Sequence, residues 1–266
     1  MKGAGLAVRS LLLALALTLG VAGPAAAAEP RRYRCAALGE ESAPIIDGKS
    51  DPVWERAPWS EPFVDIEGDR RPPPVHRTRF RALWNERALY VLAELEEPHL
   101  YATLTEHDSV IFHDPDFEIF LDPEGDRRNY FELEVNALGT TWDLRLDRPY
   151  HESGKPDDAW ELTGLGLAIE LSGSLNDPRD IDSGWTIEMA LPWGAFASPE
   201  RTGRPPRAGE SWRVNFSRVE WPLEIGPGGY GKVAGACEEN WVWSPQGRID
   251  MHRPEQWGSF DFVAAE

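Results

Sequence analysis

Hydrophobic and polar residues alternate along much of the chain after residue 77, and this period of two is typical of half-buried β-strands. Turn-forming residues such as Asp122-Pro123-Glu124-Gly125 separate the alternating runs. The pattern predicts nine strands, over residues 78–84, 88–95, 116–122, 130–136, 140–146, 165–171, 185–191, 212–218 and 257–262. Because Pro and Gly between the runs exclude long helices, only a short stretch at 194–197 is predicted to be helical. The sequence therefore predicts an all-β fold, a single-domain antiparallel β-sandwich.

Three consecutive strands are predicted to share a polar face. In YFELEVN (130–136) the apolar side chains point to the core, which leaves Glu132, Glu134 and Asn136 on the other face. Glu118 has the equivalent place in DFEIFLD (116–122), and in TTWDLRL (140–146) Trp142 and the leucines are predicted to point away from the polar face. The predicted polar patch consists of Glu118, Glu134, Asn136, Asp143 and Arg145. An ordinary solvated face is the alternative interpretation.

The first 28 residues are predicted to be a secretory signal rather than part of the fold. Lys2 and Arg9 precede an apolar run at 11–21, and Ala26 and Ala28 occupy the small-residue positions of a cleavage site. A membrane anchor is the alternative, but this run is shorter than the roughly 18 residues that a spanning helix needs. We expect cleavage after Ala28 to release the domain of residues 29–266 as a soluble secreted or periplasmic protein.

Export bears on the two cysteines, because thiols pair in oxidising compartments. Cys35 and Cys237 are predicted to form one disulfide that joins the start of the domain to a segment near its end. Two free buried thiols are the alternative.

Composition excludes several classes of function. The chain has 45 acidic and 27 basic residues, and a net charge of −18 makes non-specific nucleic-acid binding unfavourable. Two cysteines are too few for a four-thiolate zinc site, and 12 tryptophans with 41% hydrophobic residues exclude a disordered chain. The sequence contains no H-E-x-x-H, G-x-S-x-G, phosphate-binding loop or G-x-G-x-x-G motif. No catalytic residue is therefore assigned, and a non-enzymatic function is favoured.

Short segments in a fixed order resemble those of family 9 carbohydrate-binding modules. They are IIDG (45–48) with DPVW (51–54), LWN (83–85) with LYV (89–91), EIFLD (118–122) with EVN (134–136), GWTIE (184–188) with PW (192–193), and NFSR (215–218) with PEQWG (254–258). The resemblance implies a jelly-roll-like, DOMON-like β-sandwich that binds an oligo- or polysaccharide on its concave sheet. It also implies a non-catalytic role in polysaccharide breakdown or uptake, for which no cofactor is required, and calcium in a stabilising role suits the family. We expect the protein to be a monomer.

The resemblance also implies positions for a sugar-binding site. The family's carboxylate falls on Glu118 and one of its aromatic residues on Phe112, while the second aromatic falls near Met251. Its arginine falls near Glu134, which reverses the charge. Substitute donors or stacking groups are Arg145, Arg218, Trp241, Trp243 and His252, although core packing is the alternative role for the two tryptophans. The full candidate set is Phe112, Glu118, Glu134, Asn136, Arg145, Asn215, Arg218, Trp241, Trp243, Met251 and His252.

Other candidate features lie outside this set. Structural calcium is an option at the acids around one turn, because calcium prefers oxygen ligands; these acids are Asp114, Asp116, Asp122, Glu124 and Asp126. The glycine-rich segment 226–231 is predicted to be a flexible surface loop that flanks the binding site.

Two alternative functions stay open. The first is a haem-binding electron-transfer domain, with Met251 or Met189 as one axial ligand and His107, His113 or His252 as the other. The second is a glycoside hydrolase, whose two carboxylates would come from the neighbouring strands; the candidates are Glu118, Glu132 and Glu134.

Overall fold

The structure is a computed structural model, which describes residues 29–39, 43–197 and 202–265. The predicted signal, residues 1–28, lies outside the described residues. Within them the fold is all-β, with short 3₁₀-helices and no α-helix, as the alternation predicts. Over the same residues, no helix has the length and apolar character needed to cross a membrane.

The strands belong to one large sheet and one separate hairpin. The main path of the large sheet runs in the order β8-β7-β6-β5-β11-β15-β1-β3-β4-β10-β9, and off this path β14 pairs with β11 and β2 pairs with β14. The strands of the large sheet are β1 (Arg32–Ala37), β2 (Val64–Asp65), β3 (Thr78–Trp84), β4 (Ala88–Glu96), β5 (Asp116–Asp122), β6 (Tyr130–Asn136), β7 (Thr141–Leu146), β8 (Pro156–Asp157), β9 (Gly166–Ser172), β10 (Gly184–Pro192), β11 (Ser211–Glu220), β14 (Glu239–Val242) and β15 (Gly258–Val263). The hairpin consists of β12 (Leu223–Gly226) and β13 (Gly229–Lys232). The 3₁₀-helices are η2 (Pro52–Arg56), η3 (Gly68–Arg70), η4 (Ile111–His113), η5 (Tyr150–Glu152), η6 (Trp193–Phe196) and η7 (Pro254–Gln256).

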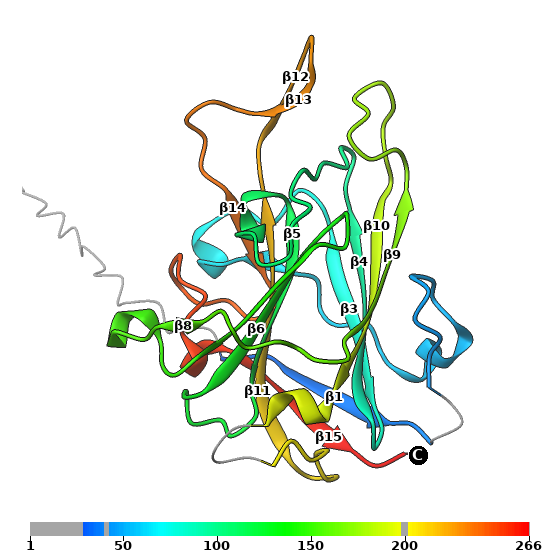
Figure 1. Ribbon diagram of the computed structural model, residues 1–266, viewed down its shortest axis with the longest axis vertical. Coiled ribbons are helices and arrows are strands. Elements are labelled where there is room, and N and C mark those ends of the chain that lie inside the picture. Colours follow the sequence, from blue (N-terminus) through cyan, green and yellow to red (C-terminus); the bar gives the residue numbers. More distant parts are fainter. Residues whose placement is uncertain (1–28, 40–42, 198–201, 266) are drawn as a thin grey trace, which may run out of the picture.

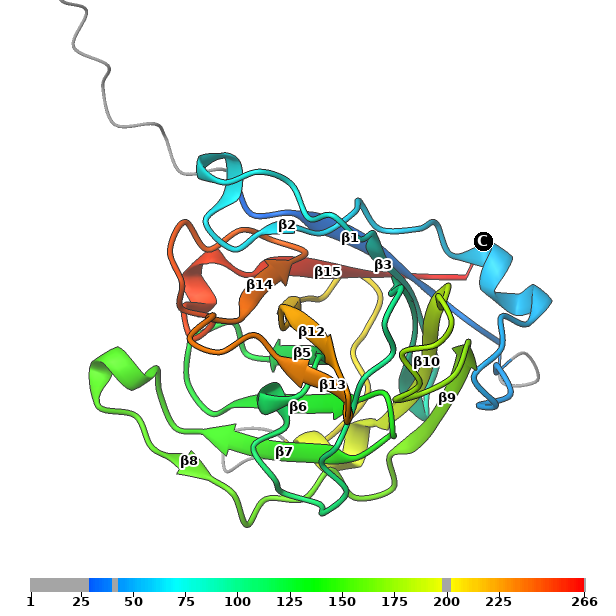
Figure 2. The ribbon, with the colours of Figure 1, turned by 90° about the horizontal axis from the view of Figure 1, so that it is seen from above.

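The large sheet curls so that two layers of strands face each other. Figure 1 shows β5, β6 and β11 in one layer and β3, β4, β10 and β9 in the other. Seen from above, β15 and β1 connect the two layers along one side of the molecule (Figure 2). This arrangement is the predicted β-sandwich.

The main core lies between the two layers. Phe117 and Ile119 of β5 and Leu133 of β6 pack there with Phe80 of β3 and Val91 of β4, and all five are almost completely buried. These are the positions that the period-two pattern assigns to the core face. All nine predicted strands are present, and the residues 78–84, 116–122 and 130–136 form β3, β5 and β6 with the predicted ends.

The sheet is mixed rather than purely antiparallel. The strand β1 pairs in parallel with both β15 and β3, whereas the other pairs of the large sheet are antiparallel. The strand β1 carries Arg32 and Arg34 beside Tyr33 and Cys35 and was not among the predicted strands. The strand β14 was also missed, because only four residues belong to it.

The predicted disulfide between Cys35 and Cys237 is wrong, since both thiols are free. The side chain of Cys35 points from β1 into the main core, where it is completely buried. Cys237 lies between β13 and β14 and is exposed. A thiol enclosed by core side chains cannot meet a cysteine at the surface without a rearrangement of the backbone.

A buried glutamate joins two segments that resemble the carbohydrate-binding family. Glu188 of β10 is fully buried on the outer side of its layer, where Trp54 of η2 donates its indole N–H to Oε1 at 2.7 Å. The backbone N–H groups of Asp47 and Gly48 donate to Oε2 at 2.9 and 2.8 Å. Gly48 has a φ of 86°, and a Cβ there would lie 2.9 Å from the backbone N of Glu170, so only glycine fits. Glu188 therefore holds the segment 45–54 against the sheet.

We expect Glu188→Gln to lower the free energy of unfolding by about 1–2 kcal/mol, because an amide NH₂ would face donors that now bond to a carboxylate oxygen. Urea denaturation of both proteins measures this loss. The matched control is Glu170→Gln on the adjacent strand β9, where the side chain is exposed, and it should leave the midpoint unchanged. Equal midpoints for Glu188→Gln and the wild type would contradict the anchoring role.

The glycine-rich segment 226–231, predicted as a flexible surface loop, forms the turn and flanks of the β12–β13 hairpin. The hairpin projects from the end of the sandwich (Figure 1). Its Tyr230 hydroxyl lies 3.0 Å from Nδ1 of His99, and Lys232 Nζ lies 3.6 Å from the centre of the Trp221 ring. Lys232 also donates to the carbonyl oxygen of His113 in η4. The hairpin is thus tied to neighbouring elements by named contacts.

Candidate functional site

Four acidic side chains project from β5 and β6 on the side away from the main core. Glu118 lies directly opposite Glu134, and Asp116 and Glu132 are the next residues on this face of their strands. We call Asp116, Glu118, Glu132 and Glu134 the acid cluster. Ser217 of β11 lies directly opposite Glu118 on the other side, so its hydroxyl belongs to the same face.

Three members of the acid cluster, Glu118, Glu132 and Glu134, line a pocket of about 210 Å³; Asp116 is not part of the lining. Phe112 of η4 and Trp142 of β7 form one wall, with ring centres 6.5 Å apart and an angle of 31° between the rings. Tyr150 of η5 and His252 stand together at another part of the lining, with ring centres 4.4 Å apart. The remaining lining residues are Ile66, Phe120, Val219, Glu238, Asn240, Ile249, Asp250 and Met251. None of the lining residues is a lysine or an arginine, so the pocket is strongly acidic.

Two buried carboxylate oxygens of the acid cluster lack hydrogen-bond partners. Asp116 Oδ1 accepts the backbone N–H of Val219 at 3.0 Å, but its Oδ2 has no partner. Glu132 Oε2 is also without a hydrogen bond. These side chains are 1% and 5% exposed, respectively. Native proteins pair almost all of their buried polar atoms, so these two atoms indicate a place where another group binds.

Burial changes the protonation of these groups. Burial raises the pKa of Glu118 to about 7, and the nearby Ser217 hydroxyl opposes that rise. Burial and the charges of neighbouring carboxylates raise the pKa values of Asp116 and Glu134 well above their usual range, and the same causes act on Glu132. Burial lowers the pKa of His252 to about 4. At neutral pH the cluster on its own therefore retains protons, and His252 carries no charge.

Residues 46–209 match the model of a family described as carbohydrate family 9 binding domain-like. The chain belongs to this family. The match covers more than half of the chain and includes Phe112, the acid cluster and Trp142. The part of the pocket formed by Asn240, Met251 and His252 follows the matched range.

Curated relatives of this family 9-like chain are much longer proteins. The chain is 27% identical over 150 residues to endo-1,4-beta-xylanase C of Paenibacillus barcinonensis, an alignment that covers 53% of this chain and 12% of that protein. It is 22% identical over 162 residues to endo-1,4-beta-xylanase A of Thermoanaerobacterium saccharolyticum, again over 12% of that protein and 60% of this chain. The chain thus spans about an eighth of the length of these relatives.

Solved structures of similar fold include a family 9 carbohydrate-binding module and a putative carbohydrate-binding protein. A family 9 carbohydrate-binding module from Caldicellulosiruptor kristjanssonii in complex with cellotriose matches with a TM-score of 0.59 at 17% identity, over 89% of this chain and 95% of that one. A putative carbohydrate-binding protein from Bacteroides uniformis matches with the same TM-score at 20% identity, over 89% of this chain and 98% of that one. At these identities the likeness shows a shared β-sandwich fold.

The structure brings five of the eleven residues proposed for this family 9-like site into one pocket. They are Phe112, Glu118, Glu134, Met251 and His252. Glu134, which stands near the position of the family's arginine, accepts the backbone N–H of Phe112 at 2.9 Å and so holds η4 over the pocket.

The other six candidates have contacts of their own elsewhere. Asn136 donates to the Leu104 carbonyl and to Asp114, and Asn215 exchanges hydrogen bonds with the backbone of Ser244. Arg145 pairs with Asp157 at 2.9 Å. Arg218 is buried between Glu97 and Glu220 at 2.6 and 2.7 Å, with its guanidinium over the Trp241 ring. Trp241 and Trp243 are packed in the main core, as their alternative interpretation states.

The predicted orientation of the strand at 140–146 is wrong. Leu144 lies directly opposite Glu132, whereas Asp143 lies opposite Leu133. Trp142, Leu144 and Leu146 therefore share the face of the acid cluster, and Asp143 and Arg145 are on the other face. Leu144 and Leu146 pack there in a second apolar cluster with Phe120, Tyr130 and Trp257, which the sequence pattern alone does not reveal. The reversal brings Trp142 into the pocket.

Several lining residues were not predicted from the sequence. Trp142 was assigned to the wrong face, and Tyr150, Asn240, Ile249 and Asp250 belong to segments outside the predicted strands. Glu132 could have been included in the predicted site, because it lies two residues from Glu134 and so on the same face of β6. The loop residues carry no such periodic signal.

Two groups of side chains among the described residues have ligand atoms close enough to hold one metal ion. They are Asp116 with Glu118 and Glu134, and His107 with Asp108 and Asp143. Of the acids first considered for calcium, only Asp116 belongs to either group. Asp114 instead accepts hydrogen bonds from Thr103, Leu104 and Asn136, and Asp122 accepts backbone N–H groups of its own turn.

The placement of the candidate haem ligands does not support the haem-binding alternative. Met189 is completely buried in the main core, whereas His107 and His113 are exposed at the surface. Met251 and His252 both line the pocket but are adjacent in sequence. The carboxyl groups considered for a hydrolase do lie together in the acid cluster, and a binding-module family fits a non-enzymatic function.

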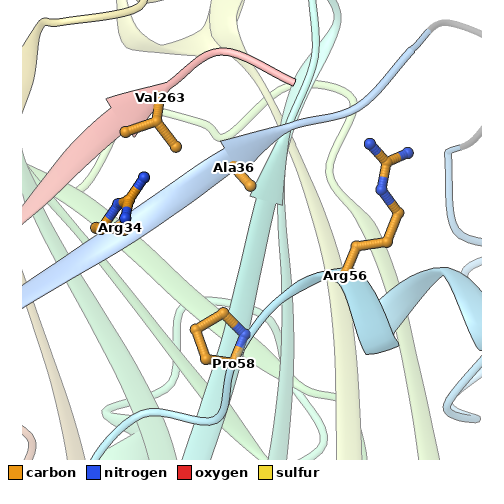
Figure 3. A pocket seen from close by; sticks show the side chains of 5 residues that line it. All are labelled: Arg34, Ala36, Arg56, Pro58 and Val263. Atoms are coloured by element: carbon orange, nitrogen blue, oxygen red, sulfur yellow. The ribbon is translucent and has the colours of Figure 1, made fainter. Parts of the chain in front are cut away.

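A second hollow, of about 330 Å³, lies elsewhere on the molecule. Figure 3 shows its lining side chains, which are Arg34 and Ala36 of β1, Val263 of β15, Arg56 of η2 and the following Pro58. It shares no residue with the acidic pocket and lacks both carboxylates and aromatic rings in its lining. The acidic pocket is taken as the candidate site because it combines carboxylates and aromatic rings with five of the residues proposed from the sequence.

Proposed function

We propose that this chain binds a saccharide non-covalently in the acidic pocket over β5, β6 and β7. The observation that carries the proposal is the position of Glu118, which lies at the bottom of a pocket whose walls include the rings of Phe112 and Trp142. Membership of a carbohydrate family 9 binding domain-like family supports it. A structural neighbour of the same family was solved in complex with cellotriose, which supports a glucan-like ligand.

The pocket has the two kinds of group that a sugar needs. The faces of a pyranose ring carry C–H groups that pack on aromatic rings, and Phe112 and Trp142 offer such surfaces. The hydroxyl groups both donate and accept hydrogen bonds, so they need polar partners at fixed positions. Carboxylates accept from hydroxyls, and protonated carboxyls also donate to them. Asn240 adds an amide to the lining.

We infer that the mature protein acts outside the cytoplasm, in polysaccharide breakdown or uptake. The signal-like sequence at 1–28 supports export, and the relatives named as xylanases support a polysaccharide as the partner. The binding is proposed to need no catalytic step and no second copy of the chain.

A panel of soluble oligosaccharides tests the proposal by isothermal titration calorimetry on residues 29–266. Cellotriose, xylotriose and chitotriose are suitable probes because they share β-1,4 linkages and differ in their side groups. We expect a saturable heat with at least one of them. Flat titrations with all three, together with no signal on a glycan array, would contradict the proposed function.

Trp142→Ala should weaken saccharide binding about tenfold, because the ring surface on one wall of the pocket is lost. Calorimetry with the best oligosaccharide of the panel measures the change. Trp59→Ala is the matched control: Trp59 stacks on Arg79 and Arg81 and does not line the pocket, so this variant should bind normally. Equal losses in the two variants would show that the effect is not specific to the pocket.

A further inference from the structure

We propose that Asp116, Glu118 and Glu134 hold a divalent cation of the calcium class at the bottom of the acidic pocket, where it completes the saccharide site. The cation site stands on the side chains alone, and its role in sugar binding rests on the proposed function.

The geometry of the three carboxyl groups suits one ion. Each offers an oxygen atom, and these oxygens all lie within 4.8 Å of one another. Calcium binds its oxygen ligands at about 2.3–2.6 Å, so two ligands of one ion are separated by no more than about 5 Å. Asp116, Glu118 and Glu134 come from adjacent, directly paired strands, which fixes this arrangement in the sheet.

The buried atoms without hydrogen bonds point to a missing partner independently of the charge. Asp116 Oδ2 belongs to a side chain that is 1% exposed, and this oxygen has no hydrogen bond. Glu132 Oε2 on the neighbouring strand is a second buried acceptor without a partner. Both oxygens have lone pairs that a cation at this place would attract. Ser217 Oγ lies beside Glu118 across the β11–β5 pair and offers a further oxygen.

The local charge also favours a cation. Four carboxyl groups share a buried surface, and the pocket lining supplies no lysine or arginine to balance them. Ionised carboxylates in such a place repel one another and lose solvation, so they need a bound positive charge or protons. A divalent ion supplies two charges in the space between the ligand atoms.

The ligand atoms select the kind of ion. The group contains oxygen donors only, which favours a hard cation and disfavours zinc or copper. Calcium tolerates irregular geometry and six to eight ligands, whereas magnesium requires a near-ideal octahedron. Three carboxylates and a serine hydroxyl leave coordination positions open. Glu118 and Glu134 line the pocket, so these open positions are within reach of two neighbouring sugar hydroxyls.

Titration of the metal-free protein with CaCl₂ tests the site without any sugar. Residues 29–266 are treated with a chelator, and calcium binding is measured by calorimetry and by sensitised Tb³⁺ luminescence, for which Trp142 is a nearby donor. We expect one site per chain. Asp116→Asn and Glu134→Gln should each weaken it at least tenfold, while their amide oxygens can still accept the N–H groups of Val219 and Phe112.

Asp108→Asn is the matched control, because Asp108 belongs to the other group of potential ligands, with His107 and Asp143. It should leave calcium binding unchanged, and circular dichroism should show that all three variants are folded. Absence of calcium binding in the wild type, or its loss only in Asp108→Asn, would overturn the cation site.

The role of the cation in sugar binding is tested by repeating the oligosaccharide titration in the presence of calcium and in the presence of EDTA. We expect affinity to fall at least tenfold in EDTA. Calcium binding with unchanged sugar affinity would overturn the bridging role alone, and calcium binding with no sugar binding under any condition would instead contradict the proposed function. Preference for an amino sugar, such as a glucosamine oligomer, in EDTA would show that an ammonium group of the ligand takes the place of the metal.

Discussion

Glu118→Ala is expected to fold like the wild type and to bind the preferred oligosaccharide about 10- to 150-fold more weakly, a loss of about 1.5–3 kcal/mol. The carboxyl group lies at the bottom of the pocket with its side chain 4% exposed, so a sugar hydroxyl that it contacts is shielded from water. Hydrogen bonds to charged groups are worth this amount when solvent cannot replace them. Calorimetry at fixed calcium concentration measures the affinity.

The control for this variant is Glu170→Ala on β9, where the side chain is exposed and does not line the pocket. It should bind the oligosaccharide with wild-type affinity. A second variant, Glu118→Gln, keeps the shape of the side chain and tests whether the carboxyl group itself matters. Wild-type affinity in both Glu118 variants would remove this residue from the binding site.

Glu118→Gln is expected to become more stable relative to the wild type as the pH rises, in protein kept free of divalent cations. The pKa of Glu118 is raised from 4.5 to about 7, so between these values the native state retains a proton that the unfolded chain releases. Stability from this group is therefore present at pH 4.5 and is lost as the pH rises through 7. The part of the wild-type free energy of unfolding that depends on this proton is about 3 kcal/mol at most. Because glutamine does not titrate, Glu118→Gln lacks this pH dependence.

Comparing the two proteins removes the contribution of His252. Burial lowers the pKa of this histidine from 6.5 to about 4. The stability that depends on its neutral form therefore has the opposite pH dependence, and it is lost as the pH falls below 6.5. It is present in both proteins and cancels in their difference. Urea denaturation at pH 4.5, 6 and 7.5 gives the curves. Parallel curves would contradict a raised pKa for Glu118, and added calcium should bring the two curves closer together at pH 7.5.

The fold could be predicted where side chains alternate over a whole strand. The strands β3, β5 and β6 have seven residues each, and core and polar positions follow one another without interruption. The strand β14 has only four residues, and the parallel pairing of β1 depends on contacts with β15 that are distant in sequence. In β7 the alternation itself was read correctly, but both faces of the strand are partly covered. The sequence could not show which of them belongs to the main core.

The site could be predicted where a strand position fixed it. Glu118 and Glu134 project toward one face because of the period of two, and their strands are neighbours. Arg218 could not be placed in the same way, since Glu97, its partner at 2.6 Å, is 121 residues away in sequence. The pairing of Cys35 with Cys237 failed for a related reason, because a cysteine count does not show that one side chain points into the core.

Hydrogen–deuterium exchange with and without the best-binding oligosaccharide tests most directly whether the acidic pocket is the saccharide site. Binding there should slow exchange in residues 110–113, 141–146 and 249–253, which carry Phe112, Trp142 and His252. The segments around the second hollow, 32–37 and 52–58, should exchange at the same rate in both samples. Protection confined to those two segments, or none in the pocket segments at saturating sugar, would contradict a saccharide site over β5, β6 and β7.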